Sequence, residues 1–374
     1  MDFLPKFRFP KFDLVIPVAA LFLIIIGLST IQSTILAGGE SNPVLQANLI
    51  NVQILSVVIG FAVLAIISKL NYHYLEHFSV LLYIVAIILL VVVLFLADPT
   101  RGSVRWLTIG PVNLQPSTYS TLMLILFFAY YFTKVGDKIN KIKYLILSVV
   151  LVMIPAFLLL LEPDLGSALL LLIVYVVLLH MTSLSWKKLL TLYIMAILAV
   201  PLLWFNLESY QKDRIFSFVN PAADPSATGY NVIQSMIAVG SGQLLGRGWG
   251  RGTQSHLQYL PEQHTDFIFA TFAEEQGFVG ALVLLTIILL IIIRLVLICT
   301  RTTDNFGKLI VVGVLTWYCI HIFINIGMNI GIAPITGIPL LFVSYGGSAM
   351  VAALTAMGIV ESVYRFGVED ASVS

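Results

Sequence analysis

Residues 252–280 read GTQSHLQYLPEQHTDFIFATFAEEQGFVG, and they join a polar loop to an apolar run long enough to cross a bilayer. Within this segment, His264-Thr265-Asp266-Phe267 marks the point where the loop becomes a helix, with Thr265 as the expected N-cap. The helix dipole favours an ionised Asp266 at that position. The segment therefore predicts a membrane-spanning helix with an ionised carboxylate at its beginning, a position where an anionic base could sit.

Composition sets the class of protein. Hydrophobic residues make up 59% of the 374 residues, charged residues only 10%, and the mean hydropathy is +1.00. These values exclude an ordinary soluble globule and indicate a polytopic membrane protein. The net charge of +1 gives no case for binding nucleic acid. Cys299 and Cys319 both lie in apolar runs, which favours packed or lipid-facing thiols over a disulfide or a metal site.

Apolar runs predict an all-helical fold with ten transmembrane spans in one membrane domain covering residues 1–374. The first run, Leu14 to Ile35, follows Lys6, Arg8 and Lys11 and is too long for a signal-peptide core, so we expect a retained anchor helix. The other spans are expected near residues 50–68, 77–97, 117–133, 144–161, 165–182, 187–205, 267–298, 308–330 and 345–364.

Ten spans place both termini on the same side of the membrane. With the termini inside, 14 of the 20 Lys and Arg residues fall in the cytoplasm, and the positive-inside rule then predicts cytoplasmic ends. The six outside are Arg101, Arg105, Lys212, Arg214, Arg247 and Arg251. This orientation also places Asp266 on the outer face.

The extracellular loop between spans 7 and 8, about residues 206–265, is too long for a bare connection, so we expect it to be structured. Ile233 to Val239 is apolar but too short to span, and glycines recur from Gly240 to Gly252. This pattern predicts an interfacial or re-entrant helix followed by a flexible segment.

A family resemblance rests on the same segment. Residues 260–277 match the pattern LPExHTDFIFAxxxEExG of the SEDS family of cell-wall glycan polymerases at Leu260, Pro261, Glu262, His264 to Ala270, Glu274, Glu275 and Gly277. Thr253-Gln254-Ser255 is similar to the family's elongation branch, RodA. Thr336 stands where the division branch, FtsW, usually has lysine. The resemblance extends from the first apolar run to Arg365.

The resemblance implies a bacterial cytoplasmic (inner) membrane enzyme that polymerises lipid II into glycan strands during cell elongation, with inversion at the anomeric carbon. Asp266 matches the residue held essential for polymerisation and would be the general base. An aspartate at a helix start is otherwise more often a cap, and Glu262, Glu274 and Glu275 more often pack or orient. The family also implies a class B penicillin-binding protein as partner, and Glu262, His264 and Thr265 as substrate-binding residues.

Cations and polar faces supply further candidates. Arg101, Arg105 and Arg214 are expected to bind the substrate's pyrophosphate, with lipid headgroups as the alternative for the last two. For Arg247 and Arg251, headgroups are the better expectation. A divalent cation (Mg²⁺ or Mn²⁺) could screen the pyrophosphate, but the sequence indicates no dedicated metal site, since the H-x-x-E-H string at 73–77 has no third ligand.

His321, Asn325 and Asn329 recur every fourth residue and therefore share one face of the ninth span. They either bond between helices or, with Ser344, line a cavity that binds substrate. Asp164, in Glu162-Pro163-Asp164-Leu165-Gly166, is expected to cap and pack a tight turn between spans.

The chain departs from the family pattern at three polar positions. The family's QPSExxK glutamate and lysine are replaced by Thr118 and Thr121, and its QSKIA lysine is replaced by Met236. Loss of the glutamate and lysine together avoids stranding one charge in the membrane. Two rival functions remain open: a flippase for the lipid-linked precursor, and a non-catalytic scaffold for the transpeptidase. The outward clustering of ionisable residues favours chemistry over transport.

Overall fold

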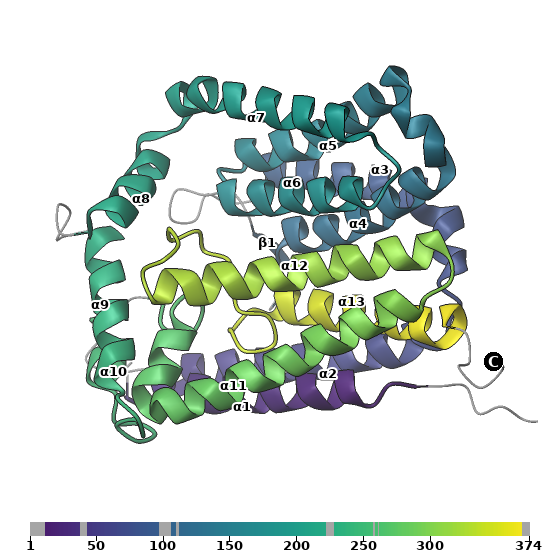
Figure 1. Cartoon of the computed structure of the whole chain (residues 1–374). Helices are drawn as coiled ribbons and strands as arrows, with labels where there is room; N and C mark the ends of the chain where they lie inside the picture. Colours follow the sequence, from purple (N-terminus) through teal and green to yellow (C-terminus); the bar gives the residue numbers. More distant parts are fainter. Residues whose placement is uncertain are drawn as a thin grey trace, which may run out of the picture.

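The computed structural model describes residues 12–368 except 38–42, 97–105, 110–111, 222–227, 257–258 and 261. The described chain is almost entirely helical, and Figure 1 shows long helices lying side by side with α8 and α9 across one end of them. The long helices are α1 Val15–Ala37, α2 Pro43–Ile67, α3 His73–Leu96, α4 Pro116–Val135, α5 Ile142–Leu161, α6 Leu165–His180, α7 Trp186–Asn206, α11 Ile268–Arg301, α12 Asn305–Asn329 and α13 Gly347–Gly367. The shorter ones are η1 Gly136–Asn140, α8 Ser209–Val219, α9 Thr228–Ser241 and α10 Thr253–His256.

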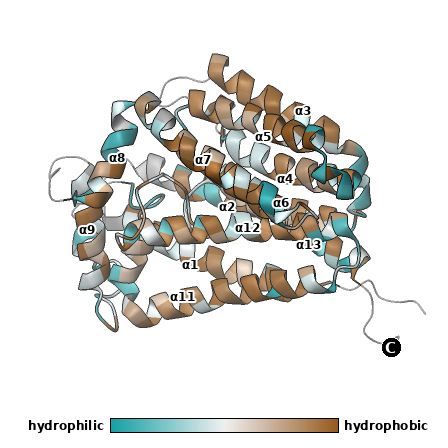
Figure 2. Ribbon diagram, turned by 45° about the horizontal axis from the view of Figure 1, so that its top comes forward, coloured by the Kyte–Doolittle hydropathy of each residue, from teal (hydrophilic) through white to brown (hydrophobic). Residues whose placement is uncertain are grey.

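A long helix stands at each of the ten places where the sequence predicts a span. Within the described residues, eight of them are long and apolar enough to cross a membrane; α6 is apolar but shorter, and α7 is not among the eight. Figure 2 shows hydrophobic residues covering the long helices and hydrophilic residues gathered toward their ends and on α8. The chain is therefore a multi-pass membrane protein, whereas ten crossings stay a prediction.

The beginning of α1 and the end of α13 lie at the same end of the bundle. The Asp13 N–H donates to the Glu361 carboxylate at 3.0 Å, and Arg294 of α11 forms an ion pair with the Asp13 carboxylate at 2.5 Å. Thr302 bridges Val368 just after α13. This arrangement agrees with an even number of crossings; which side is cytoplasmic stays a prediction.

Helices α12 and α13 form the centre of the bundle. Helix α12 contacts α4, α6, α9, α11 and α13, while α13 packs closely along α2. Small residues permit this second contact, because a Cβ on Gly358 would lie 2.9 Å from the Leu64 Cα, and one on Gly60 would overlap Leu354. Without a hydrophobic driving force in lipid, such close backbone packing is a main source of helix association.

A short β-hairpin between α3 and α4 was not predicted. Strands β1 Leu107–Ile109 and β2 Val112–Leu114 pair antiparallel, with Leu107 opposite Leu114, and β2 contacts α13. Three-residue strands carry too little alternation to be recognised between two apolar runs. The expectation of a purely helical chain needs this one correction.

The long loop before α11 carries structure, as predicted, and it pairs with a break in α11. Gly277 has φ 66° and ψ −165° inside that helix, a conformation for which glycine is favoured. The N–H groups of Phe278 and Val279 donate to Gln243 O and Leu244 O at 2.8 and 3.1 Å. A Cβ on Gly277 would lie 2.7 Å from the Leu244 oxygen. The loop thus supplies the backbone bonds that the helix lacks at its break.

Helix α1 approaches the segment between α12 and α13, residues 330–346, at Gly27. A Cβ on Gly27 would overlap the carbonyl oxygen of Val343, whereas one on Gly240 of α9 would meet nothing within 4 Å. Both glycines lie inside helices with ordinary backbone angles. They form a matched pair for testing the packing.

We expect Gly27→Ala to lower the free energy of unfolding by about 1–3 kcal/mol, because backbone atoms must shift to admit the methyl group. Gly240→Ala should be neutral or slightly stabilising, since alanine suits an unobstructed helix interior. Thermal unfolding of the two variants in detergent measures the difference. Equal melting temperatures would contradict the described approach of α1 to Val343.

Candidate active site

Asp266 lies in a tight turn just before α11. The N–H groups of Thr265, Asp266 and Phe267 converge on the Glu262 carbonyl oxygen at 3.1, 3.1 and 3.3 Å, and Glu262 has a positive φ of 50°. Helix α11 begins only at Ile268, with Phe267 as its N-cap. The predicted capping by Thr265 is therefore wrong, because its hydroxyl donates to the Glu262 carbonyl and carboxylate, both at 3.2 Å.

The backbone of this turn is held by the C-terminal part of the chain. The carbonyl oxygens of His264 and Thr265 accept from the Tyr345 N–H at 2.9 Å and the Ser344 hydroxyl at 2.8 Å. The Asp266 carbonyl accepts from the amides of Asn325 and Asn329, each at 3.1 Å. Three successive carbonyls thus have partners outside the turn, and the position of Asp266 is fixed from α12 and residues 344–345.

Asn325 and Asn329 are fully buried, and Ser344 nearly so. Of the two alternatives, these asparagines fit hydrogen bonding to neighbouring segments better than lining a cavity. Both donate to Asp266 O, and Asn329 also accepts from the Ala270 N–H of α11 at 3.1 Å. We describe all three as positioning residues for Asp266. Their predicted contact with substrate stays a prediction.

Two polar residues that the sequence reading missed support this arrangement. The Gln53 side chain on α2 donates to Ser344 O at 3.4 Å and accepts from the Gly346 N–H at 3.1 Å. The Ser235 hydroxyl on α9 donates to Asn329 O at 2.9 Å. A glutamine within an apolar span is a signal that could have identified Gln53.

The surroundings of the Asp266 side chain are polar and aromatic. Asp266 is half-buried, and a Cβ on Gly337 would lie 3.7 Å from its Oδ2. The rings of His264 and Tyr345 meet edge to face with centroids 5.6 Å apart. Burial raises the pKa of the Tyr345 phenol above its ordinary value, so this ring stays neutral. The side chains of this turn that can accept a proton are therefore the carboxylates of Asp266 and Glu262 and the imidazole of His264.

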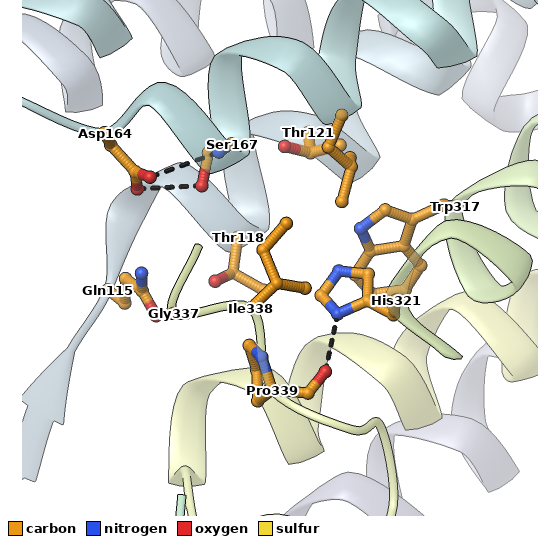
Figure 3. Close-up of a pocket in the computed structure, with 11 residues that line it drawn as sticks. Gln115, Thr118, Thr121, Asp164, Ser167, Trp317, His321, Gly337, Ile338 and Pro339 are labelled. Atoms are coloured by element: carbon orange, nitrogen blue, oxygen red, sulfur yellow. Dashed lines mark hydrogen bonds between the residues drawn. The ribbon is translucent and has the colours of Figure 1, made fainter. Parts of the chain in front are cut away.

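A small polar cavity, which Gly337 also lines, lies between α4, α6 and α12 (Figure 3). It leaves about 30 Å³ for the centres of water molecules, enough for one or two of them. The lining residues are Gln115, Thr118, Thr121, Asp164, Ser167, Leu170, Trp317, His321, Gly337, Ile338 and Pro339.

Hydrogen bonds define the character of this cavity. Asp164 caps α6 as predicted, accepting from the Ser167 N–H at 3.1 Å and its hydroxyl at 2.8 Å. His321 Nδ1 lies 2.9 Å from Pro339 O, so this nitrogen carries the proton and Nε2 of the neutral ring is an acceptor. Apart from Asp164 the lining is uncharged. His321 therefore follows the cavity alternative, unlike the two asparagines.

The cavity explains where the departures from the family pattern lie. Thr118 and Thr121 both face it from α4, and the Thr121 hydroxyl is occupied by Ser117 O at 2.9 Å. Thr118 and Thr121, which stand where the family pattern has a glutamate and a lysine, therefore both line a space large enough for water. Met236, the third departure, lies on α9 against Gly331, where a Cβ would be 3.4 Å from its Cγ.

The carboxylates of Glu274 and Glu275 hold residues 250–254, at the beginning of α10 and just before it, in keeping with the orienting role expected for these two glutamates. The Glu274 carboxylate accepts from the Gln254 N–H at 2.9 Å and the Thr253 hydroxyl at 3.2 Å. The Glu275 carboxylate accepts from the Gly250 N–H at 3.2 Å and from the Ser33 hydroxyl on α1. Both carboxylates are buried, and the two glutamates lie eight and nine residues after Asp266 in the sequence.

Of the three arginines predicted to bind the pyrophosphate, only Arg214 lies within the described residues. Arg101 and Arg105 lie outside the described residues, and Arg214 is half-exposed on α8, which crosses the end of the bundle. Within the described part of the chain, no three His, Cys, Asp or Glu side chains gather closely enough to hold a metal ion.

Comparison with known proteins gives consistent results. The family model described as "Cell cycle protein", covering FtsW, RodA and SpoVE, matches residues 13–368. The peptidoglycan glycosyltransferase MrdB of Escherichia coli K12 is 37% identical over 309 residues, covering 82% of this chain and 83% of that protein. A probable peptidoglycan glycosyltransferase FtsW of Trichlorobacter lovleyi is 31% identical over 362 residues, 96% of this chain and 94% of that protein.

Solved structures show the same fold. A chain from a study of how a peptidoglycan synthase complex coordinates polymerization and crosslinking has a TM-score of 0.79 at 27% identity, covering 95% of this chain and 98% of that one. The rod shape determining protein RodA of Thermus thermophilus has a TM-score of 0.71 at 25% identity, covering 98% and 100%. The chain therefore belongs to the FtsW/RodA/SpoVE family of membrane proteins, the SEDS family.

Proposed function

We propose that this protein is a peptidoglycan glycosyltransferase that polymerises lipid II into glycan strands during cell elongation. The observation that carries the proposal is the position of the Asp266 carboxylate at the end of the bundle that α8 and α9 cross. Its backbone is held by the side-chain amides of Asn325 and Asn329, which both donate to Asp266 O and which we call the backbone clamp. The relatives' activity supports the reaction, and the similarity to MrdB and RodA supports the elongation role.

In the proposed reaction, Asp266 removes the proton from an acceptor sugar hydroxyl as its oxygen attacks the donor's anomeric carbon. The new C–O bond forms on the face opposite the departing pyrophosphate, which leaves with the electron pair of the broken bond, so the configuration inverts. Asp266 then returns the proton to water. A clamped backbone keeps the carboxylate in place and lowers the entropic part of the barrier.

Substrate binding is assigned around the same turn. Glu262, His264 and Thr265 border Asp266 in the turn itself. Arg101, Arg105 and Arg214 would bind the pyrophosphate, since a guanidinium forks onto phosphate oxygens. The growing strand would be crosslinked by a class B penicillin-binding protein in the bacterial cytoplasmic membrane, a pairing supported by similarity to a chain of a peptidoglycan synthase complex.

Asp266→Asn tests the base directly. The amide keeps the shape of the side chain but cannot accept the proton, so polymer yield from purified lipid II should fall by a factor of about 10²–10⁴. Asp137→Asn, on exposed η1 at the other end of the bundle, is the matched control and should retain full activity. Full polymer yield from the Asp266 variant would remove this residue from the mechanism. A precursor-flipping function predicts instead that lipid II transport persists in both variants.

Asn329→Ala tests the clamp. Loss of the bonds to Asp266 O and the Ala270 N–H should lower kcat more than it raises KM, and should destabilise by about 1–3 kcal/mol because buried groups lose partners. Asn140→Ala is the control, since it also removes hydrogen bonds, to Ser183 and Ser185, but far from the site. A loss of kcat in proportion to stability in both variants would contradict a positioning role.

Thr118→Glu and Thr121→Lys test the missing pair. The glutamate alone would enter the cavity that Asp164 also lines and should destabilise by about 2–3 kcal/mol, with the lysine restoring part of this in the double variant. A double-mutant cycle of unfolding free energies and polymerase rates measures the coupling. Strictly additive changes would show that the two positions do not interact, and would favour reduced catalysis or a scaffold role as the reason for the departure.

A further inference from the structure

The loop Gly242–Gly252, between α9 and α10, displays large apolar side chains at the surface. Leu244, Leu245 and Trp249 are 67%, 80% and 45% exposed. The loop contains no acidic residue, and it carries Arg247 and Arg251, both exposed. An exposed apolar group with adjacent positive charge is unfavourable in water and typical of a segment that lies at a lipid surface.

The leucines are presented on a fixed backbone. Arg247 and Gly248 donate their N–H groups to Glu274 O and Glu275 O, each at 3.0 Å, and Gly246 donates to Gly242 O at 2.8 Å. The Glu275 carboxylate accepts from the Gly250 N–H at 3.2 Å. The Glu275 carboxylate and the backbone carbonyls of Glu274 and Glu275 in α11 thus hold a loop whose leucines are largely exposed.

The position of the loop identifies what covers it. Phe278 and Val279, whose N–H groups bond Gln243 and Leu244, are themselves 61% and 49% exposed and begin the exposed apolar side of α11, continued by Leu282 and Val283 at 52% each. The apolar tip is therefore continuous with the face of a candidate membrane span.

Trp249 and the two arginines complete the arrangement. The indole N–H of Trp249 donates to Ser29 O on α1 at 3.1 Å, while much of its ring stays exposed, as in the aromatic belts of membrane proteins. Among the described residues neither guanidinium is in an ion pair; Arg247 Nε donates only to Ser241 O, at 3.4 Å. Both are available to lipid phosphates.

We propose that this loop is a rigid membrane anchor, in which Leu244 and Leu245 insert among lipid chains and Arg247 and Arg251 bind the phosphates of anionic phospholipids. The anchor does not depend on the proposed catalytic function. Because Glu274 and Glu275 lie on the first turns of α11, it fixes the level of the Asp266 turn relative to the lipid surface.

Insertion is measured with a spin label at Leu245→Cys in a background of Cys299→Ser and Cys319→Ser, reconstituted in phosphatidylglycerol and phosphatidylcholine vesicles. The label should collide more with oxygen than with a water-soluble nickel chelate. A label at Asp137→Cys, in exposed η1, is the aqueous control and should show the reverse. Equal nickel accessibility at both positions would overturn the proposal.

Phosphate binding is measured from the rise in melting temperature of the detergent-solubilised full chain on adding phosphatidylglycerol or phosphatidylcholine. Arg247→Gln and Arg251→Gln should each weaken the phosphatidylglycerol affinity roughly fivefold, so the double variant Arg247→Gln/Arg251→Gln should bind this lipid more weakly than either single variant. The control, Lys138→Gln/Lys141→Gln, removes the same charge from exposed positions elsewhere and should keep it. Equal losses in both pairs, equal effects of the two lipids, or a response only to a polyprenyl pyrophosphate would each overturn the proposal.

Discussion

The need to pair backbone carbonyls in an apolar surrounding governs the arrangement around Asp266. The turn before α11 leaves the carbonyls of His264, Thr265 and Asp266 without partners in the helix, and a buried carbonyl that lacks a hydrogen bond is costly. Partners come from Tyr345, Ser344 and the two asparagines of α12. A single local requirement therefore connects residues about 60 to 80 positions apart and fixes the backbone that carries the Asp266 carboxylate.

The sequence predicts much of this. Apolar run length places all the long helices, since each must cover the same thickness of hydrocarbon. Polar residues at every fourth position of α12 predict a shared polar face. What those residues bond to could not be read, because the choice between a second helix, a turn and a cavity depends on packing: Asn325 and Asn329 reach the turn, whereas His321, one helical turn earlier, lines the cavity.

Local features that depend on partners elsewhere were missed for the same reason. Thr265 has the residue type of an N-cap, but three N–H groups converge on the Glu262 carbonyl, and α11 begins only at Ile268. The Thr265 hydroxyl therefore donates to the Glu262 carbonyl and does not cap the helix. The conformation of Gly277 follows from a loop thirty residues earlier. Thr118 and Thr121 are recognisable as departures only against the family pattern, and their common position beside a polar cavity required the structure.

The break in α11 has an evolutionary consequence for the loop that meets it. Surface loops ordinarily accept insertions and deletions. Here Gln243 and Leu244 accept from Phe278 and Val279, while Arg247 and Gly248 donate to Glu274 and Glu275. Only Leu245 and Gly246 separate the two pairs, so one added or lost residue would leave helix backbone groups unpaired. In homologous chains, the length of this loop should be conserved as strictly as that of a core helix.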